Sequence, residues 1–215
     1  MSEKLRILLT GFGAFPGAPH NPTQPLVARL AQLRRPALDD VALSSHIFPV
    51  TYAAVDRQLP DVLAKVRPDA LLMFGLAART PYLRIETRAR NAVTMLWPDA
   101  ANTRSSERGI TGAADAMNFG PHTARLLRAA RLTGIDARPS RDAGAYLCNY
   151  LSWRAIENVR AGGPQLAAFI HIPLLARGGA VRRKGAARIT LEQLVDAGEA
   201  MLMEMVGLAR KARAS

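Results

Sequence analysis

The chain has 215 residues, long enough to bury a sizeable hydrophobic core within one domain spanning residues 1–215. Its hydrophobic fraction of 49% and charged fraction of 21% are those of an ordinary globular protein and exclude a low-complexity chain. The net charge of +12 raises the hypothesis of an anionic partner, but only Arg177–Arg188 and Arg210–Arg213 are densely basic, so no nucleic-acid partner is expected.

The amino terminus and the cysteine content indicate the compartment. Residues 1–4 lead directly into an apolar run of six residues, which is too short for a secretory signal or a membrane span. The one cysteine, Cys148, cannot form an intramolecular disulfide and leaves a free thiol. Both features favour a cytoplasmic protein with no membrane partner.

Apolar runs and helical spacing alternate along the chain. The apolar runs predict strands at residues 5–10, 41–50, 70–75, 137–140 and 166–172. Helical spacing predicts a helix that begins directly after Thr23 and further helices at 53–66, 124–133, 145–160 and from 190 onward. The pattern at 82–97 is mixed, and residues 100–119 are predicted to form a loop.

Three sites carry helix-end signals. We expect Thr23 to cap the first helix and Pro60 to kink or break the second. The segment Thr190–Gln193 resembles a capping box that opens the last helix.

The predicted strands are continuous apolar runs, which is typical of a sheet covered by helices on both faces. The pattern therefore predicts an α/β fold. In open sheets of this kind, ligands bind beyond the carboxyl ends of the strands. We expect the chemistry near residues 10–15, 75–79 and His171.

Cofactor motifs have little support. The sequence Gly11-Phe12-Gly13 follows a strand, but the third glycine of a dinucleotide fingerprint would fall on Pro16. No Walker A sequence is present, and the four histidines lack the spacing of a zinc site. We expect no cofactor and no metal.

Cys148 is a candidate nucleophile because of its position. Gly144 allows a sharp turn, and a helix is predicted to begin directly after it. A helix amino terminus presents free N–H groups and a partial positive charge, which stabilise a thiolate. The alternative interpretation is a small buried apolar side chain.

His171 and Glu86 are candidate partners of the thiol. His171 stands near the end of an apolar strand, where a general base could meet a nucleophile, although many such histidines are structural. Glu86 could orient the imidazole, or it could form a surface ion pair with a nearby arginine. Spacing alone leaves both alternatives open.

Four blocks of sequence, in order, resemble the pyroglutamyl peptidase I family, also known as pyrrolidone-carboxylate peptidases. The blocks are Thr10–Phe15 with Asn21–Thr23, Gly75–Arg79 with Ile85–Glu86 and Asn91, Ser140–Asn149, and Phe169–Pro173. The likeness extends from Leu5 to about Gly198.

The resemblance implies an activity, a fold and a site. It implies a single-domain α/β/α sandwich with a mixed, largely parallel sheet, assembled in many members as a homotetramer. It assigns Cys148 as nucleophile, His171 as general base and Glu86 as the residue that orients it, acting on peptides with an N-terminal pyroglutamate. The implied pocket residues are Phe12, Phe15, Leu76, Trp97, Tyr146 and Leu147.

Some positions depart from the family pattern. Leu76 replaces a common glutamine, Thr87 replaces an arginine, Ala176 replaces a proline, and residues 90–103 diverge. Two alternatives follow: a cysteine amidohydrolase acting on another N-terminal acyl group, and a non-catalytic basic binding protein. The role of the basic segment Arg177–Arg188 stays open.

Overall fold

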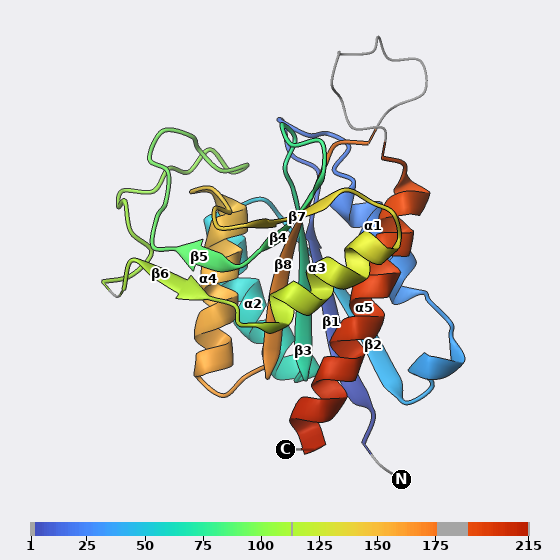
Figure 1. Ribbon diagram of the computed structural model, residues 1–215. Coiled ribbons are helices and arrows are strands. Elements are labelled where there is room, and N and C mark those ends of the chain that lie inside the picture. Colours follow the sequence, from blue (N-terminus) through green and yellow to red (C-terminus); the bar gives the residue numbers. More distant parts are fainter. Residues whose placement is uncertain (1–2, 113, 176–188, 215) are drawn as a thin grey trace.

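A computed structural model describes residues 3–112, 114–175 and 189–214 (Figure 1). The basic segment Arg177–Arg188 and the departure at Ala176 lie outside the described residues.

A six-stranded sheet forms the centre of the molecule. Its strand order is β2-β1-β3-β8-β4-β7. The first four strands run parallel, β4 runs antiparallel to β8, and β7 runs parallel to β4. The strands are β1 Leu5–Phe12, β2 Val41–Phe48, β3 Ala70–Leu76, β4 Leu83–Glu86, β7 Ala137–Ser140 and β8 Leu166–Ile172. The prediction of a mixed, largely parallel sheet is confirmed.

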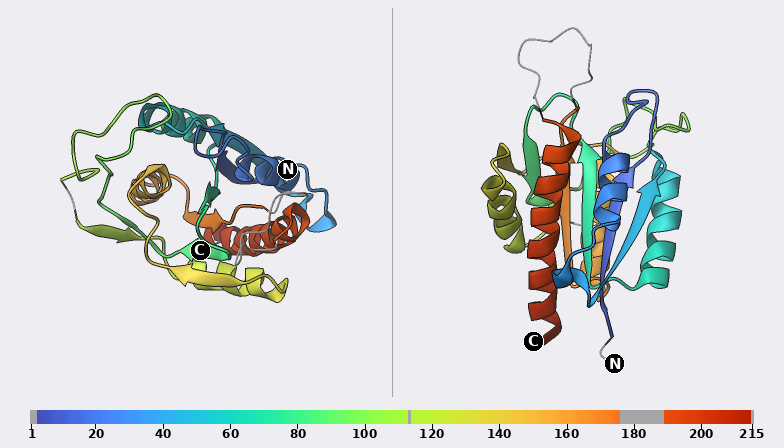
Figure 2. Two further views of the ribbon diagram at one scale, coloured as in Figure 1. Left: turned by 90° about the horizontal axis from the view of Figure 1, so that it is seen from above. Right: turned by 90° about the vertical axis from the view of Figure 1, so that its right-hand side faces the viewer.

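Helices cover both faces of this sheet (Figure 1; Figure 2). Helices α1, α3 and α5 pack on one face, whereas α2 and α4 pack on the other. The second panel of Figure 2 shows the strands between the red α5 and the teal α2. The helices are α1 Thr23–Ala31, α2 Tyr52–Val66, α3 His122–Leu132, α4 Leu147–Arg160 and α5 Leu191–Ala214, with a short 3-10 turn, η1, at Pro36–Leu38. The predicted α/β/α sandwich is confirmed.

Alternate residues of each central strand face opposite helix layers, because strand side chains have a period of two. In β8, Ala168, Ile170 and Ile172 belong to the core beneath α1, α3 and α5. Ala167 and Phe169 belong to the core beneath α2 and α4. This alternation decides which polar side chains of the strands can reach α4.

Several local predictions are wrong. Thr23 makes no capping bond; its hydroxyl instead donates to the Phe12 carbonyl at 2.8 Å and accepts from the Phe12 N–H at 3.0 Å. Helix α2 continues through Pro60 without a break. The predicted loop at 100–119 contains β6 (Ala116–Asn118), which pairs with β5 (Arg88–Arg90), because their backbone groups need partners outside the main sheet.

The start of α5 is as predicted. The Thr190 hydroxyl accepts from the Gln193 N–H at 3.2 Å, and the Gln193 side chain accepts from the Thr190 N–H at 3.0 Å. This reciprocal pair is a capping box, and it satisfies two backbone donors that the helix itself cannot. Throughout the described residues, no helix combines the length and apolarity needed to cross a membrane.

Candidate active site

Cys148 is the second residue of α4, as predicted from the glycine that precedes it. Gly144 has a φ of +85°, a left-handed conformation that favours glycine. Its N–H donates to Asp142 Oδ1 at 2.9 Å, and Tyr146 is the extended residue immediately before the helix. The half-buried thiol of Cys148 therefore lies in the first turn of α4, where free N–H groups favour a thiolate.

The sulfur fits against the end of β3 because residue 75 is glycine. A Cβ atom at Gly75 would lie 2.7 Å from Cys148 Sγ and 2.6 Å from Phe169 Cζ. Both distances are far below van der Waals contact, so any side chain here would displace the thiol or the fully buried Phe169 ring. The sequence places Gly75 at the end of an apolar run and within one of the four family blocks, but it gives no sign that the thiol packs against it.

His171 comes to the same place from β8. It follows Ala167 and Phe169 on the face that packs against α4, and only 4% of it is exposed. Its Nδ1 donates to Glu86 Oε1 at 2.7 Å, which leaves Nε2 for the thiol. His171 is therefore more than a structural histidine, because its ring interacts with two ionisable groups, Cys148 and Glu86.

The charge state of His171 follows from its neighbours. Burial favours the neutral ring, but hydrogen bonding and negative charge from Cys148 and Glu86 outweigh burial and raise the pKa of His171 to about 9. The imidazole is therefore protonated at neutral pH. A protonated imidazole beside the sulfur stabilises a thiolate.

Glu86 forms an ion pair with the nearby Arg84 at 2.9 Å, but its carboxylate is fully buried rather than on the surface, and it also bonds to His171. Strand β4 pairs antiparallel with β8, with Arg84 opposite His171 and Glu86 opposite Phe169. The antiparallel pairing thus places a carboxylate from one strand beside an imidazole from the next. The three residues predicted as a triad come together from β4, α4 and β8.

Two asparagines hold the segment that follows Glu86. The Asn149 amide accepts from the Arg90 N–H at 2.9 Å and donates to the carbonyls of Arg90 and Ala92 at 2.8 and 2.9 Å. Asn91 accepts from the N–H groups of Ile110 and Thr111 at 2.6 and 3.1 Å. Residues 90–92 are therefore tied to α4 directly beside the nucleophile. From the sequence, these asparagines were evident only as parts of blocks.

Four of the six predicted pocket residues lie on the same face of the sheet as Cys148. Phe12 and Leu147 are buried in the core cluster beneath α2 and α4, and Phe15 and Tyr146 pack against that cluster half-buried, as Cys148 does. This cluster supplies the aromatic and aliphatic surface suited to a flat, neutral ring.

The other two predicted pocket residues, Leu76 and Trp97, do not belong to this cluster. Leu76 is half-buried at the end of β3. Trp97 is 60% exposed, although the next residue, Pro98, accepts a hydrogen bond from Tyr146 at 2.9 Å. Trp97 is thus anchored near the cluster without being part of it.

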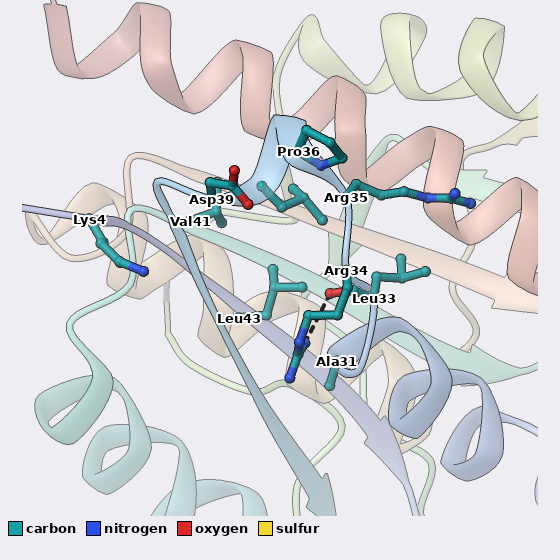
Figure 3. A pocket seen from close by; sticks show the side chains of 10 residues that line it. Lys4, Ala31, Leu33, Arg34, Arg35, Pro36, Asp39, Val41 and Leu43 are labelled. Carbon is teal, nitrogen blue, oxygen red and sulfur yellow. Dashed lines mark hydrogen bonds between the residues drawn. The ribbon is translucent and has the colours of Figure 1, made fainter.

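A separate cavity of about 560 Å³ lies beside β2 and the 3-10 turn (Figure 3). Lys4, Arg34 and Arg35 line it together with Asp39 and apolar side chains. Arg35 forms an ion pair with Glu199 at 2.7 Å, and Arg34 donates to the Leu33 carbonyl at 3.0 Å. The described residues that line it include no cysteine, serine, threonine or histidine, and the candidate nucleophile Cys148 is not among them.

Comparison with known proteins identifies the family. A family model described as pyroglutamyl peptidase matches residues 5–206. The chain belongs to the pyroglutamyl peptidase family. The match covers nearly the whole chain, and it includes all four blocks that carry the resemblance in the sequence.

Individual relatives within this family agree. A pyrrolidone-carboxylate peptidase from Gloeobacter violaceus is 31% identical over 188 residues, which are 87% of this chain and 90% of that protein. Another, from Pyrococcus furiosus, is 27% identical over 173 residues, which are 80% of this chain and 82% of that protein.

Solved structures show the same architecture. The pyrrolidone carboxyl peptidase of Fervidobacterium islandicum superposes with a TM-score of 0.86 at 26% identity, covering 95% of this chain and 99% of that chain. The pyrrolidone carboxyl peptidase from Thermococcus litoralis superposes with a TM-score of 0.87 at 23% identity. The match covers 97% of this chain and 96% of that chain and shows that the two share a fold.

Proposed function

We propose that this chain hydrolyses the amide bond that follows an N-terminal pyroglutamyl residue, through a triad of Cys148, His171 and Glu86. Membership of the pyroglutamyl peptidase family supports the activity. The observation that carries the triad is the 2.7 Å bond from His171 Nδ1 to a fully buried Glu86, with the Cys148 sulfur on the other side of the ring.

The first step forms a thioester. The Cys148 thiolate attacks the pyroglutamyl carbonyl carbon, and the carbonyl oxygen becomes an oxyanion. N–H groups in the first turn of α4, which have no partner within the helix, are aligned to stabilise that oxyanion. The C–N bond then breaks, and the departing amine takes the proton from His171 Nε2.

The second step restores the enzyme. His171, now neutral, accepts a proton from water, and the resulting hydroxide attacks the thioester carbon. The C–S bond breaks, free pyroglutamate leaves, and the thiolate and imidazolium form again. Glu86 keeps the ring in the tautomer with Nδ1–H and stabilises its charged form in both steps.

The pocket residues support a flat, neutral acyl group as substrate. Phe12, Phe15, Tyr146 and Leu147 share the core cluster beneath α2 and α4 with Cys148, and we assign them to the lactam ring. We place Leu76 and Trp97 at the rim of the same pocket. Substitution there is the means by which a divergent member would accept a different acyl group.

The test is hydrolysis of a fluorogenic pyroglutamyl amide. Cys148→Ser and His171→Ala should each abolish release of the amine, and prior alkylation of the thiol should do the same. His46→Ala is the matched control, because His46 lies on the edge strand β2 and bonds Gln58 at 2.9 Å, away from the triad. Full activity in Cys148→Ser would refute the proposed nucleophile.

A panel of other N-terminally acylated amides separates the alternatives. If the enzyme hydrolyses a different acyl amide and not the pyroglutamyl amide, the proposed substrate is wrong but the proposed cysteine mechanism stands. A thiol that alkylates no faster than free cysteine, together with salt-sensitive nucleic-acid binding, would favour the basic binding protein.

The compartment and the assembly are further parts of the proposal. We place the enzyme in the cytoplasm, where the free thiol of Cys148 stays reduced. The tetramer implied by the family resemblance also stays a prediction. Light scattering of the purified protein measures the assembly directly.

A further inference from the structure

Arg84 contacts the same carboxylate oxygen that orients the candidate base. Its guanidinium lies 2.9 Å from Glu86 Oε1, the oxygen that His171 Nδ1 approaches at 2.7 Å. Arg84 and Glu86 are two residues apart on β4, so their side chains share a face of the sheet. In the antiparallel pairing, Arg84 stands directly opposite His171. One carboxylate oxygen therefore lies between two cationic groups on adjacent strands.

The guanidinium is held from outside β4 as well. Arg84 donates to Ser140 Oγ through two nitrogens, at 2.8 and 3.2 Å, and also to the Asp142 carbonyl. Ser140 ends β7, and Asp142 lies in the turn that leads to Cys148. With its side chain only 21% exposed, Arg84 is fixed by three donor contacts rather than free at the surface.

Arg84 balances the charge of the candidate active site. In the reactive state, Cys148 carries one negative charge, His171 one positive charge and Glu86 one negative charge, which leaves a net charge of −1. Burying an unpaired charge is costly, and Glu86 is fully buried, with no hydrogen-bond partner for its Oε2 among the residues that the structure describes. The guanidinium of Arg84 brings the sum to zero. The reactive ion pair is thus neutralised within the cluster.

We propose that Arg84 is a positioning residue of the active site, which keeps Glu86 ionised and fixes the oxygen that orients His171. The proposal rests on the triad proposed above. Arg84 acts through Glu86 and does not touch the substrate, so its removal should change the chemical step rather than substrate binding.

The groups that face Glu86 define the expected pH dependence. Among the described residues these are Arg84 on β4, His171 on β8 and, behind the ring, Cys148 on α4. Asp142 contacts Arg84 only through its backbone carbonyl, and its carboxylate forms an ion pair with Arg90 at 2.9 Å instead. Without Arg84, the negative charges of Glu86 and the thiolate are no longer balanced within the cluster, which disfavours the thiolate–imidazolium pair.

The first experiment compares Arg84→Met with Arg84→Lys. Loss of the ion pair with Glu86 is expected to lower kcat by about 10- to 100-fold in Arg84→Met, with KM nearly unchanged. The acid limb of its pH–rate profile should move to higher pH, and Arg84→Lys should restore part of both. Arg138→Met is the matched control: Arg138 stands opposite Arg84 on β7 but is exposed and paired with Asp136 at 2.8 Å.

The second experiment separates action through Glu86 from a general structural role. In a Glu86→Gln background the charge to be balanced is gone, so adding Arg84→Met should change kcat by less than about threefold. A structural role would produce the same loss in both backgrounds. An equal loss, or a wild-type pH profile in Arg84→Met, would overturn the proposal.

The rate of Cys148 alkylation against pH gives a readout without turnover. In Arg84→Met the rise of this rate should move to higher pH, whereas in Arg138→Met it should not. If the wild type fails to hydrolyse pyroglutamyl amides but the shift is present, the proposed substrate is wrong and the role of Arg84 stands. An unshifted alkylation profile would contradict the role of Arg84, whatever the substrate.

Discussion

Replacing Gly75 by alanine should disable the nucleophile while leaving the fold intact. The new Cβ would stand 2.7 Å from Cys148 Sγ and 2.6 Å from Phe169 Cζ. Ordinary contacts between such atoms are about 3.5–4.0 Å, so both groups must move by roughly 1 Å. Displacement of the Phe169 ring, which is completely buried, costs stability, whereas displacement of the half-buried Cys148 sulfur costs activity.

The magnitude follows from that displacement. A misplacement of about 1 Å at a reacting group can cost on the order of 100-fold in rate, which is about 2.7 kcal/mol of transition-state stabilisation. Overpacking of this kind also destabilises a core by about 1–3 kcal/mol, which a protein of this size survives. We expect Gly75→Ala to remain folded and to lose kcat/KM about 100-fold.

The assay pairs hydrolysis of a pyroglutamyl amide with urea unfolding. Gly207→Ala is the matched control, because its added Cβ meets no atom within 4 Å and alanine favours the helix by up to about 1 kcal/mol. The control should keep full activity and gain a little stability. A folded Gly75→Ala enzyme with activity within twofold of wild type would show that the sulfur does not occupy the space over Gly75.

Three further outcomes are expected. The alkaline limb of the wild-type pH–rate profile should fall near pH 9 as His171 loses its proton, and Glu86→Gln should move that limb to lower pH because it removes a carboxylate that raises the pKa. If the alkaline limb of Glu86→Gln stays where it is in the wild type, Glu86 does not influence the protonation of His171. Asn149→Ala should lower the free energy of unfolding by about 2–4 kcal/mol, measured by urea denaturation, since it removes three hydrogen bonds to partly buried backbone groups. Thr190→Ala should cost about 1 kcal/mol in the same measurement with kcat unchanged, and a loss of activity would contradict a purely capping role.

The sequence predicted the layered fold because its strands are continuous apolar runs and its helices are amphipathic. Residues 166–172 form β8 over the range expected, since every second side chain enters one of two cores. The misassignments fell where long-range partners override local signals. Thr23 bonds to Phe12 on β1 rather than capping its own helix, and residues 116–118 form a strand because β5 lies beside them.

The candidate nucleophile could also be predicted from the sequence, because the start of a helix depends on local residues. A glycine turn before an apolar helix predicts free N–H groups beside Cys148 whatever the rest of the chain does. The choice between a catalytic and a structural His171 was not local. It required knowing which strand lies next to β8 and in which direction that strand runs.

By itself, the sequence determined the order of the five α-helices and of five of the six main-sheet strands that the structure describes, all but β4. It also determined the two-sided burial of the sheet and the setting of the thiol, since each depends on neighbours within a few residues. Only the tertiary structure decided that β4 runs antiparallel beside β8, which brings Glu86 and Arg84 to His171 across 85 residues of chain. It also decided that the thiol lies over Gly75. Strand pairing and close packing join residues that share no local pattern, and for that reason the charge balance of the site is visible only in three dimensions.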